Sequence, residues 1–180
     1  MELYFVTGNE DKVKDVEAVL GFPIKSVRLN LPEIQSLDIE EIVKAKVQSA
    51  FELVKKPVFV DDSGFYITAW NGFPGPFIKY ILSSGGNDLL LRMMETEENR
   101  EVMVNSAIGF HDGEQVYTFV GEAKGVLVVE SRGKSWGWEP IFQPLYQKQT
   151  YAEMTREYKN SISMRRVALE KFKRHLQLES

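Results

Sequence analysis

The sequence contains no cysteine among its 180 residues. Disulfide frameworks, zinc–thiolate sites and thiol nucleophiles are therefore excluded, and the chain suits a reducing compartment. No apolar run approaches the ~20 residues that a membrane-spanning helix needs, and the N-terminus lacks the basic segment that begins a signal peptide. We therefore expect a cytoplasmic protein that does not bind a membrane.

The sequence also lacks an excess of positive charge and is poor in histidine. It has 22 Lys and Arg against 26 Asp and Glu, a formal net charge of -4. Nucleic acid finds no overall attraction to such a chain, so local cations, backbone amides or a metal ion would have to hold any phosphorylated ligand. The two histidines, His111 at a hairpin tip and His175 near the end of the last helix, do not predict histidine-based catalysis. A small phosphorylated substrate is favoured over a polymer.

No repeat or low-complexity linker divides the chain, so we expect one domain over residues 1–180. In the first half, short apolar runs alternate with apolar residues at helical spacing. The predicted elements are a strand at 3–6, a helix through Val13, Val16 and Leu20, a strand at 24–27, a helix at 39–54, and a strand at 57–60 that stops at the Asp61-Asp62-Ser63-Gly64 segment. This alternation predicts an α/β fold with helices packed on a sheet.

The second half has a different pattern. Residues 72–76 hold two glycines and two prolines and predict a loop, with short helices after it at 77–82 and 87–94. Two β-rich stretches, 102–110 and 115–129, flank an Asp-Gly pair and predict a long antiparallel hairpin. A helix over about 160–176 closes the chain.

The first candidate site is the Thr7-Gly8-Asn9 turn with Lys12. It lies between a predicted strand and helix, where free N–H groups and the helix dipole favour an anion such as phosphate. The same residues also fit an ordinary loop with an Asn cap and a solvated lysine. They do not form a Walker loop, which lowers the expectation of a P-loop ATPase or kinase.

The second candidate is Asp61-Asp62-Ser63, which follows a buried strand. α/β enzymes bind ligands beyond the carboxyl ends of strands, and alternation of side chains implies that only one of the two aspartates faces such a site. Carboxylate oxygens suit Mg²⁺, which takes one or two of them together with substrate phosphates. A capped turn is the alternative reading, and Glu33, in a loop after Pro32, is by itself a surface glutamate.

The third candidate is the Trp136-Gly137-Trp138-Glu139 loop, where two indoles and a carboxylate suggest a stacking surface for a planar base. Tryptophans belong more often to a core. Lys159, Met164 and Arg165 lie around the start of the last predicted helix, where cations alone indicate a solvated face.

Taken in order, these motifs resemble the inosine triphosphate pyrophosphatase family, whose members remove ITP, dITP and XTP from nucleotide pools. The resemblance covers essentially the whole chain. Its motifs are Thr-Gly-Asn-x-x-Lys at 7–12, Leu-Pro-Glu-Ile-Gln at 31–35, Val-Asp-Asp-Ser-Gly at 60–64, Gly-Phe-Pro-Gly-Pro-Phe-Ile-Lys at 72–79, Trp-Gly-Trp-Glu-Pro-Ile-Phe-Gln-Pro at 136–144, Thr-Tyr-Ala-Glu-Met at 150–154, Lys-Asn at 159–160 and Ser-x-Arg at 163–165.

The resemblance implies an elongated α/β fold of two lobes around a long curved mixed sheet, with the active-site cleft between the lobes, and a homodimer. It implies hydrolysis of a small nucleoside triphosphate with Mg²⁺, for which Mn²⁺ is a possible substitute. By matching position, Glu33 and Asp62 would bind the metal, and Asp62 would also position or deprotonate the attacking water. The implied substrate-binding residues are Thr7, Gly8, Asn9, Lys12, Ser63, Trp136, Gly137, Trp138, Glu139, Lys159, Met164 and Arg165.

Three positions depart from the family pattern, and all lie on its base-recognition side. Glu139 stands where the family mostly has Asp, Met164 where it has His, and Tyr158 where it has an acidic residue. Catalysis is therefore better supported than substrate identity. A related pyrophosphatase acting on other modified nucleotides, and a catalytically silent nucleotide sensor, are the alternatives.

Overall fold

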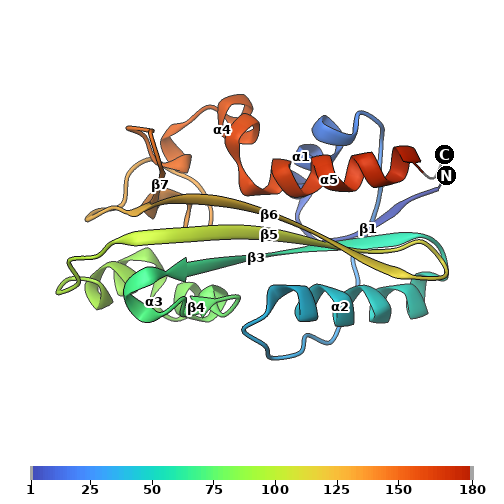
Figure 1. Cartoon of the computed structure of the whole chain (residues 1–180), viewed down its shortest axis with the longest axis horizontal. Helices are drawn as coiled ribbons and strands as arrows, with labels where there is room; N and C mark the ends of the chain where they lie inside the picture. The colour runs from blue at the N-terminus through green and yellow to red at the C-terminus, as the bar shows by residue number, and fades with distance from the viewer. Residues whose placement is uncertain (1, 179–180) are drawn as a thin grey trace. The chain divides into compact units, whose positions relative to one another are not determined.

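The computed structural model describes residues 2–178, whose strands form a mixed sheet (Figure 1). The seven strands found there are β1 (Tyr4–Val6), β2 (Lys25–Val27), β3 (Val58–Ile67), β4 (Pro74–Gly75), β5 (Glu101–His111), β6 (Val116–Leu127) and β7 (Phe142–Pro144). The α-helices are α1 (Glu10–Leu20), α2 (Ile39–Val54), α3 (Ile78–Met93), α4 (Arg156–Ile162) and α5 (Met164–Leu178). Short 3₁₀ turns are η1 (Thr68–Trp70), η2 (Glu139–Ile141) and η3 (Tyr151–Glu153).

The strands are hydrogen-bonded in the order β2-β1-β3-β5-β6-β7, and β4 pairs with β3. β1 is parallel to both β2 and β3, whereas β4 and β7 are antiparallel to β3 and β6. The predicted α/β class with a mixed sheet is confirmed. β5 and β6 form the predicted hairpin, with Asp112 Oδ1 accepting hydrogen bonds from the Glu114 and Gln115 amides in the turn.

The chain folds into two compact units. The first contains the residues up to 63, residues 106–121 and the residues from 164 onward, and the second contains 64–105 and 122–163. β3, β5 and β6 each contribute residues to both units. The candidate phosphate and metal residues of the sequence all belong to the first unit, and the Trp136–Glu139 loop and Lys159 belong to the second.

In the first unit, helices cover both faces of the sheet (Figure 1). Phe59 of β3 packs in a buried cluster with residues of α1 and α5, such as Val16 and Phe172. Val58 and Val60 pack in a second cluster with α2. Because successive strand side chains point to opposite faces, β3 is buried on both sides.

Capping residues fix the helix starts that matter for the site. The Asn9 side chain accepts hydrogen bonds from the Asp11 and Lys12 amides at the start of α1. The Asp38 side chain does the same for Glu40 at the start of α2, whose bounds match the predicted helix at 39–54. A carboxylate or amide side chain that satisfies otherwise free N–H groups makes these boundaries readable from sequence.

β3 corrects the prediction of a strand that stops at Asp61. The strand continues through Asp61, Asp62, Ser63 and Gly64 to Ile67, so neither the strand end nor the capped turn is right. The polar residues remain in the sheet because their groups find partners there. The Gly64 amide, for example, donates to the Asn105 side chain on β5 at 3.0 Å.

The final helix is also corrected, because residues 160–176 do not form one helix. Asn160 lies in α4, Ser163 is extended (φ -78°, ψ 151°), and α5 starts at Met164. The apolar periodicity continues across the break, so sequence pattern alone does not reveal it. The two short helices predicted after the Gly/Pro loop are present as the two parts of α3, which Gly86 interrupts (φ 66°, ψ -163°).

The core of the second unit is aromatic. Trp138 lies 5.3 Å from Phe65 and 5.6 Å from Phe142 between ring centroids, and Tyr151 packs against both Trp138 and Phe142. Pro74 and Gly75 of the Gly/Pro loop form the two-residue strand β4, and η1 precedes the loop. Among residues 2–178, no helix is long and apolar enough to cross a membrane.

Candidate active site

Asp61 and Asp62 lie on opposite faces of β3, as strand alternation predicts. Asp61 shares the side of Phe59, which faces α1 and α5, and Asp62 shares the side of Val58 and Val60, which faces α2. Each carboxylate therefore meets the cations of a different set of helices. This alternation organises the whole site.

The Asp61 carboxylate is buried and joins two cations. Its Oδ1 accepts a hydrogen bond from Lys12 Nζ at 2.7 Å, and its Oδ2 accepts one from Arg165 Nε at 3.0 Å. Arg165 Nη1 also lies 3.8 Å from Asp15 Oδ2. The side chains of these four residues, Asp61, Lys12, Arg165 and Asp15, are at most 17% exposed. Burial alone would raise the pKa of Asp61, but the charges of Lys12 and Arg165 outweigh it and lower the pKa to about 2.

The Asp62 carboxylate belongs to a second, more exposed network. The Nζ atom of Lys46, on α2, lies 3.3 Å from Asp62 Oδ2 and 2.9 Å from Glu33 Oε1. The Ser63 amide donates to Asp62 Oδ1 at 2.9 Å. Two carboxylates, one from β3 and one from the loop after β2, thus converge on a single ammonium group.

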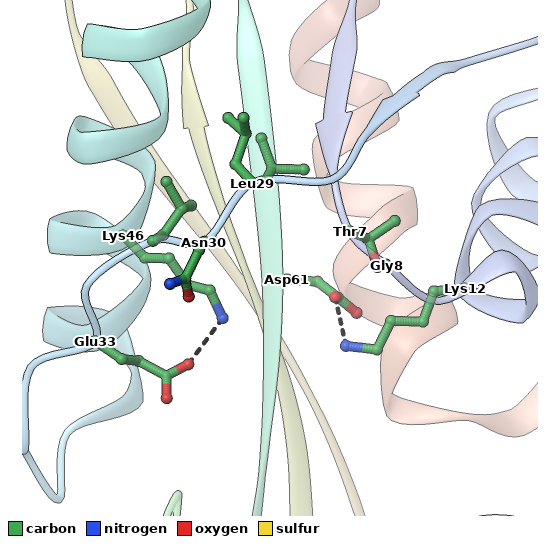
Figure 2. Close-up of a pocket in the computed structure, with 10 residues that line it drawn as sticks. Thr7, Gly8, Lys12, Leu29, Asn30, Glu33, Lys46 and Asp61 are labelled. Atoms are coloured by element: carbon green, nitrogen blue, oxygen red, sulfur yellow. Dashed lines mark hydrogen bonds and ion pairs between the residues drawn. The ribbon is translucent and has the colours of Figure 1, made fainter.

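Both networks border one cavity of about 340 Å³ in the first unit. Figure 2 shows Lys12 and Asp61 pointing toward each other on one side and Glu33 and Lys46 on the other. The lining residues are Val6, Thr7, Gly8, Lys12, Leu29, Asn30, Leu31, Glu33, Lys46 and Asp61. The structure therefore brings the first two candidate motifs together.

The Thr7–Asn9 turn is held by its own side chains. Thr7 Oγ1 accepts a hydrogen bond from the Asn9 amide at 3.1 Å, and Asn9 Oδ1 caps α1. Lys12 lies in the first turn of that helix, and its ammonium group has three donors, of which Asp61 takes one. A cation with further donors beside a helix N-terminus can bind phosphate oxygens.

The remaining candidates divide between the units. In the second, Glu139 is buried and accepts hydrogen bonds from Lys159 Nζ at 2.7 Å and from the Ser135 hydroxyl. Trp138 is 6% exposed and belongs to the core, whereas Trp136 is 42% exposed. Gly137 is left-handed (φ 64°), and its carbonyl accepts a hydrogen bond from Asn87. Met164 is buried at the start of α5, in the first unit with Arg165.

Sequence reasoning missed Lys46 and undervalued Asp61. Lys46 stands in the apolar stripe of α2 formed by Ile42, Val43, Val47 and Ala50, and a lysine in such a stripe is a signal that could have been read. The contact of Asp61 with Arg165, by contrast, joins residues 104 positions apart. Neither histidine lines the cavity; His111 stacks on Phe51 with ring centroids 3.7 Å apart.

The amino-acid sequence of this chain is similar to those of known proteins. A family model described as the Ham1 family matches residues 3–175. The chain is 40% identical over 181 residues to an inosine triphosphate pyrophosphatase of Schizosaccharomyces pombe, covering 98% of this chain and 96% of that protein. It is 39% identical to a dITP/XTP pyrophosphatase of Methanopyrus kandleri, covering 96% and 94%.

Solved structures agree with the fold. The Ham1 protein of Staphylococcus aureus matches with a TM-score of 0.87 over 100% of both chains at 23% identity. A nucleoside-triphosphatase, or dITP/XTP pyrophosphatase, of Mycobacterium abscessus matches with a TM-score of 0.75 at 25% identity, covering 96% of this chain and 98% of that chain.

Proposed function

The chain belongs to the Ham1 family, and from this premise we propose that it hydrolyses non-standard purine nucleoside triphosphates to the monophosphate and pyrophosphate. ITP, dITP and XTP are the substrates, in keeping with the names of the similar proteins from S. pombe and M. kandleri. The observation that carries the proposal is the cavity of the first unit, where the Thr7–Lys12 turn meets Glu33 and Lys46, and Lys46 also contacts Asp62.

The triphosphate binds at the Thr7–Lys12 turn. Thr7, Gly8 and Asn9 supply the turn at the start of α1, and Lys12 supplies a positive charge whose orientation Asp61 fixes. Because Lys12 keeps donors beyond the one on Asp61, it can neutralise the charge that develops on the phosphates during bond cleavage. Ser63, next to Asp62 on β3, adds a hydroxyl on the opposite face of the strand, the face of Asp61.

The residues present fit a divalent metal. Glu33 and Asp62 already hold one cation, the Lys46 ammonium, between their oxygens, and hard carboxylate oxygens are the ligands that Mg²⁺ or Mn²⁺ takes. In the described residues no cluster of three or more His, Cys, Asp or Glu could hold a metal by itself, which matches an ion that also needs substrate phosphates. When bound, such an ion supplies charge neutralisation on the phosphates and lowers the pKa of a bound water.

Asp62 is the residue that positions the attacking water or accepts its proton. Its side chain is 24% exposed and so reachable by water, whereas the Asp61 side chain is 4% exposed and held between two cations. The Ser63 backbone amide donates a hydrogen bond to Asp62 Oδ1, which fixes the orientation of the carboxylate. A fixed, solvent-reachable carboxylate is the geometry that a general base requires.

The base is recognised by the residues that the family resemblance implies. Trp136 is the indole exposed enough to stack on a base, and Trp138 supports the loop from the core. The Glu139–Lys159 pair and Gly137 of the second unit would address the polar edge of the base, and Met164 and Arg165 of the first unit are the other substrate-binding residues that the resemblance implies. We also propose that the enzyme is a cytoplasmic homodimer and that residues 1–180 act as a single domain.

The test is release of pyrophosphate from a panel of triphosphates with Mg²⁺: ITP, dITP, XTP, GTP, ATP and modified pyrimidine nucleotides. The proposal expects turnover of the first three at a much higher kcat/KM than of ATP. Preference for modified pyrimidines would favour the related pyrophosphatase instead. Binding without turnover would identify a nucleotide sensor.

A further inference from the structure

Arg28 contacts the backbone of the phosphate turn, residues 7–12, although Arg28 lies outside the sequence motif of that turn. It follows β2 directly, and its Nη2 donates a hydrogen bond to the Gly8 carbonyl oxygen at 3.0 Å. A Cβ atom built on Gly8 would lie 3.0 Å from Arg28 Nε. The guanidinium group therefore lies against Gly8, and the residues after Arg28, Leu29 and Asn30, line the same cavity as Gly8.

The other cations of this site are paired with carboxylates. Lys12 contacts Asp61, Arg165 contacts Asp61 and Asp15, and Lys46 contacts Glu33 and Asp62. Arg28 makes no ion pair with any residue in the described part of the chain, and its one hydrogen bond goes to a neutral carbonyl. It is thus the basic side chain at this turn whose charge no protein carboxylate offsets.

This arrangement suits a polyanion. The partial negative charge of the Gly8 carbonyl oxygen would repel a nearby phosphate. The hydrogen bond from Arg28 offsets that partial charge. A guanidinium has five N–H donors in a planar fork. One is used on Gly8, and the rest match the oxygens of a phosphoryl group, to which arginine forms charge-assisted hydrogen bonds.

We propose that Arg28 is a triphosphate-binding residue, held against Gly8 so that the strand-β2 side of the phosphate turn carries an uncompensated positive charge. The inference rests on the proposed function and extends it, because Arg28 lies outside every motif of the family resemblance. Its contacts are with phosphates, so it should contribute to binding of ITP, XTP and dITP by the same factor.

The experiment measures ITP binding by calorimetry with EDTA present, so that neither turnover nor metal enters the result. Arg28→Ala should weaken binding about 10-fold or more, the usual size of a lost hydrogen bond to a charged group, and Arg28→Lys should fall between. In steady-state assays KM should rise for all three substrates by one factor. The matched control is Arg174→Ala, because Arg174 is also an exposed arginine whose hydrogen bond goes to a backbone carbonyl, that of Glu170; it should change nothing.

A second variant tests the contact with Gly8. Gly8 does not have the left-handed backbone that disfavours other residues, so Gly8→Ala is conformationally allowed, and its methyl group would displace the guanidinium. Gly8→Ala should weaken ITP binding in the wild-type background and add little to Arg28→Ala, because both changes remove one contact. Additive losses would show that the Gly8 contact does not position Arg28.

The outcomes separate this inference from the proposed function. If the wild-type protein neither binds nor cleaves ITP, both are wrong. If it binds and cleaves ITP but Arg28→Ala, verified as folded by circular dichroism, binds ITP as tightly as wild type, the role of Arg28 alone is wrong. A loss restricted to one base would also overturn it, because a phosphate contact cannot distinguish bases.

Discussion

Asp61 and Asp62 are adjacent in β3, yet their carboxylates belong to separate ion-pair networks. Asp61 joins Lys12 and Arg165 in the interior, and Asp62 shares Lys46 with Glu33 at the more exposed side. The alternation of a single strand thus separates two tasks. The buried carboxylate contacts two cations, and we propose that the more exposed one serves water and metal.

The first prediction concerns the rate. Asp62→Asn keeps the shape of the side chain but removes the proton acceptor, so kcat for ITP should fall ~10²-fold or more. The ion pair that it loses is partly exposed, so the free energy of unfolding should change by less than about 1 kcal/mol. Near wild-type turnover in a folded, purified Asp62→Asn protein would refute the role of Asp62.

The second prediction concerns stability. Asp61→Asn leaves Arg165 without one of its two carboxylates and Lys12 without the carboxylate that it contacts. Breaking a buried ion pair by removing one partner is strongly destabilising, so the free energy of unfolding at pH 7 should fall by about 3 kcal/mol. Urea titration followed by circular dichroism measures this change, and Asp62→Asn is the matched control on the same strand.

The effect of Asp61 should also depend on pH. The folded-state pKa of Asp61 is lowered from 3.8 to about 2, so the charged form stabilises the fold fully above about pH 4, and this stabilisation is lost as the pH falls toward 2. The difference between wild type and Asp61→Asn should therefore shrink between pH 5 and pH 2. A difference that stays constant over that range would mean that the Asp61 charge does not stabilise the protein.

The sequence predicts the bounds of α2 but not the end of β3, and the difference has a physical reason. The α2 bounds were predicted because a cap and a strong apolar period mark them. β3 was cut short because Asp61-Asp62-Ser63-Gly64 has the composition of a turn, and only contacts with distant residues such as Asn105 show that those polar groups are satisfied inside a sheet. Local sequence patterns predict local structure, but the pairing of a strand with residues distant in sequence can override them.

The same distinction applies to the candidate site. Thr7, Gly8, Lys12 and Glu33 were predicted from motifs, and the structure brings all four to one cavity. The partners that orient or neutralise them were missed, because Asp61 meets Lys12 across 49 residues and Arg165 across 104. The roles in binding, metal coordination and catalysis that we assign to the motif residues remain predictions for the experiments described.

A further prediction concerns Lys46 and the metal. The Lys46 ammonium lies between Glu33 and Asp62, where it balances their charge and would compete with a divalent ion that these carboxylates bound. Lys46→Met should therefore raise the affinity of the substrate-free protein for Mn²⁺, measured by electron paramagnetic resonance. Lys44→Met removes the same charge from an exposed position of α2 and should have a smaller effect. An unchanged or weaker Mn²⁺ affinity in Lys46→Met would place the ion elsewhere.

The last prediction concerns base selectivity. Inosine and xanthine carry a 6-oxo acceptor where adenine has an amino donor, and Lys159 supplies donors beyond the one that Glu139 accepts. An adenine would leave these donors unmatched at about 1–3 kcal/mol for each buried group, so ITP should be cleaved with a much higher kcat/KM than ATP. If ATP is cleaved as well as ITP, the assignment of Lys159 to the base is wrong.

GTP shares the 6-oxo group, so excluding it requires a penalty at the 2-position. Met164 is buried and supplies an adaptable apolar chain where the family has a histidine with a ring donor. We therefore expect looser discrimination among ITP, XTP and GTP in this protein, and expect Met164→His to restore part of it. The kcat/KM ratios of ITP to GTP for the two proteins test this, with thermal unfolding as the control for folding of the variant. If Met164→His leaves the ratio unchanged in a folded protein, position 164 does not control the response to the 2-amino group.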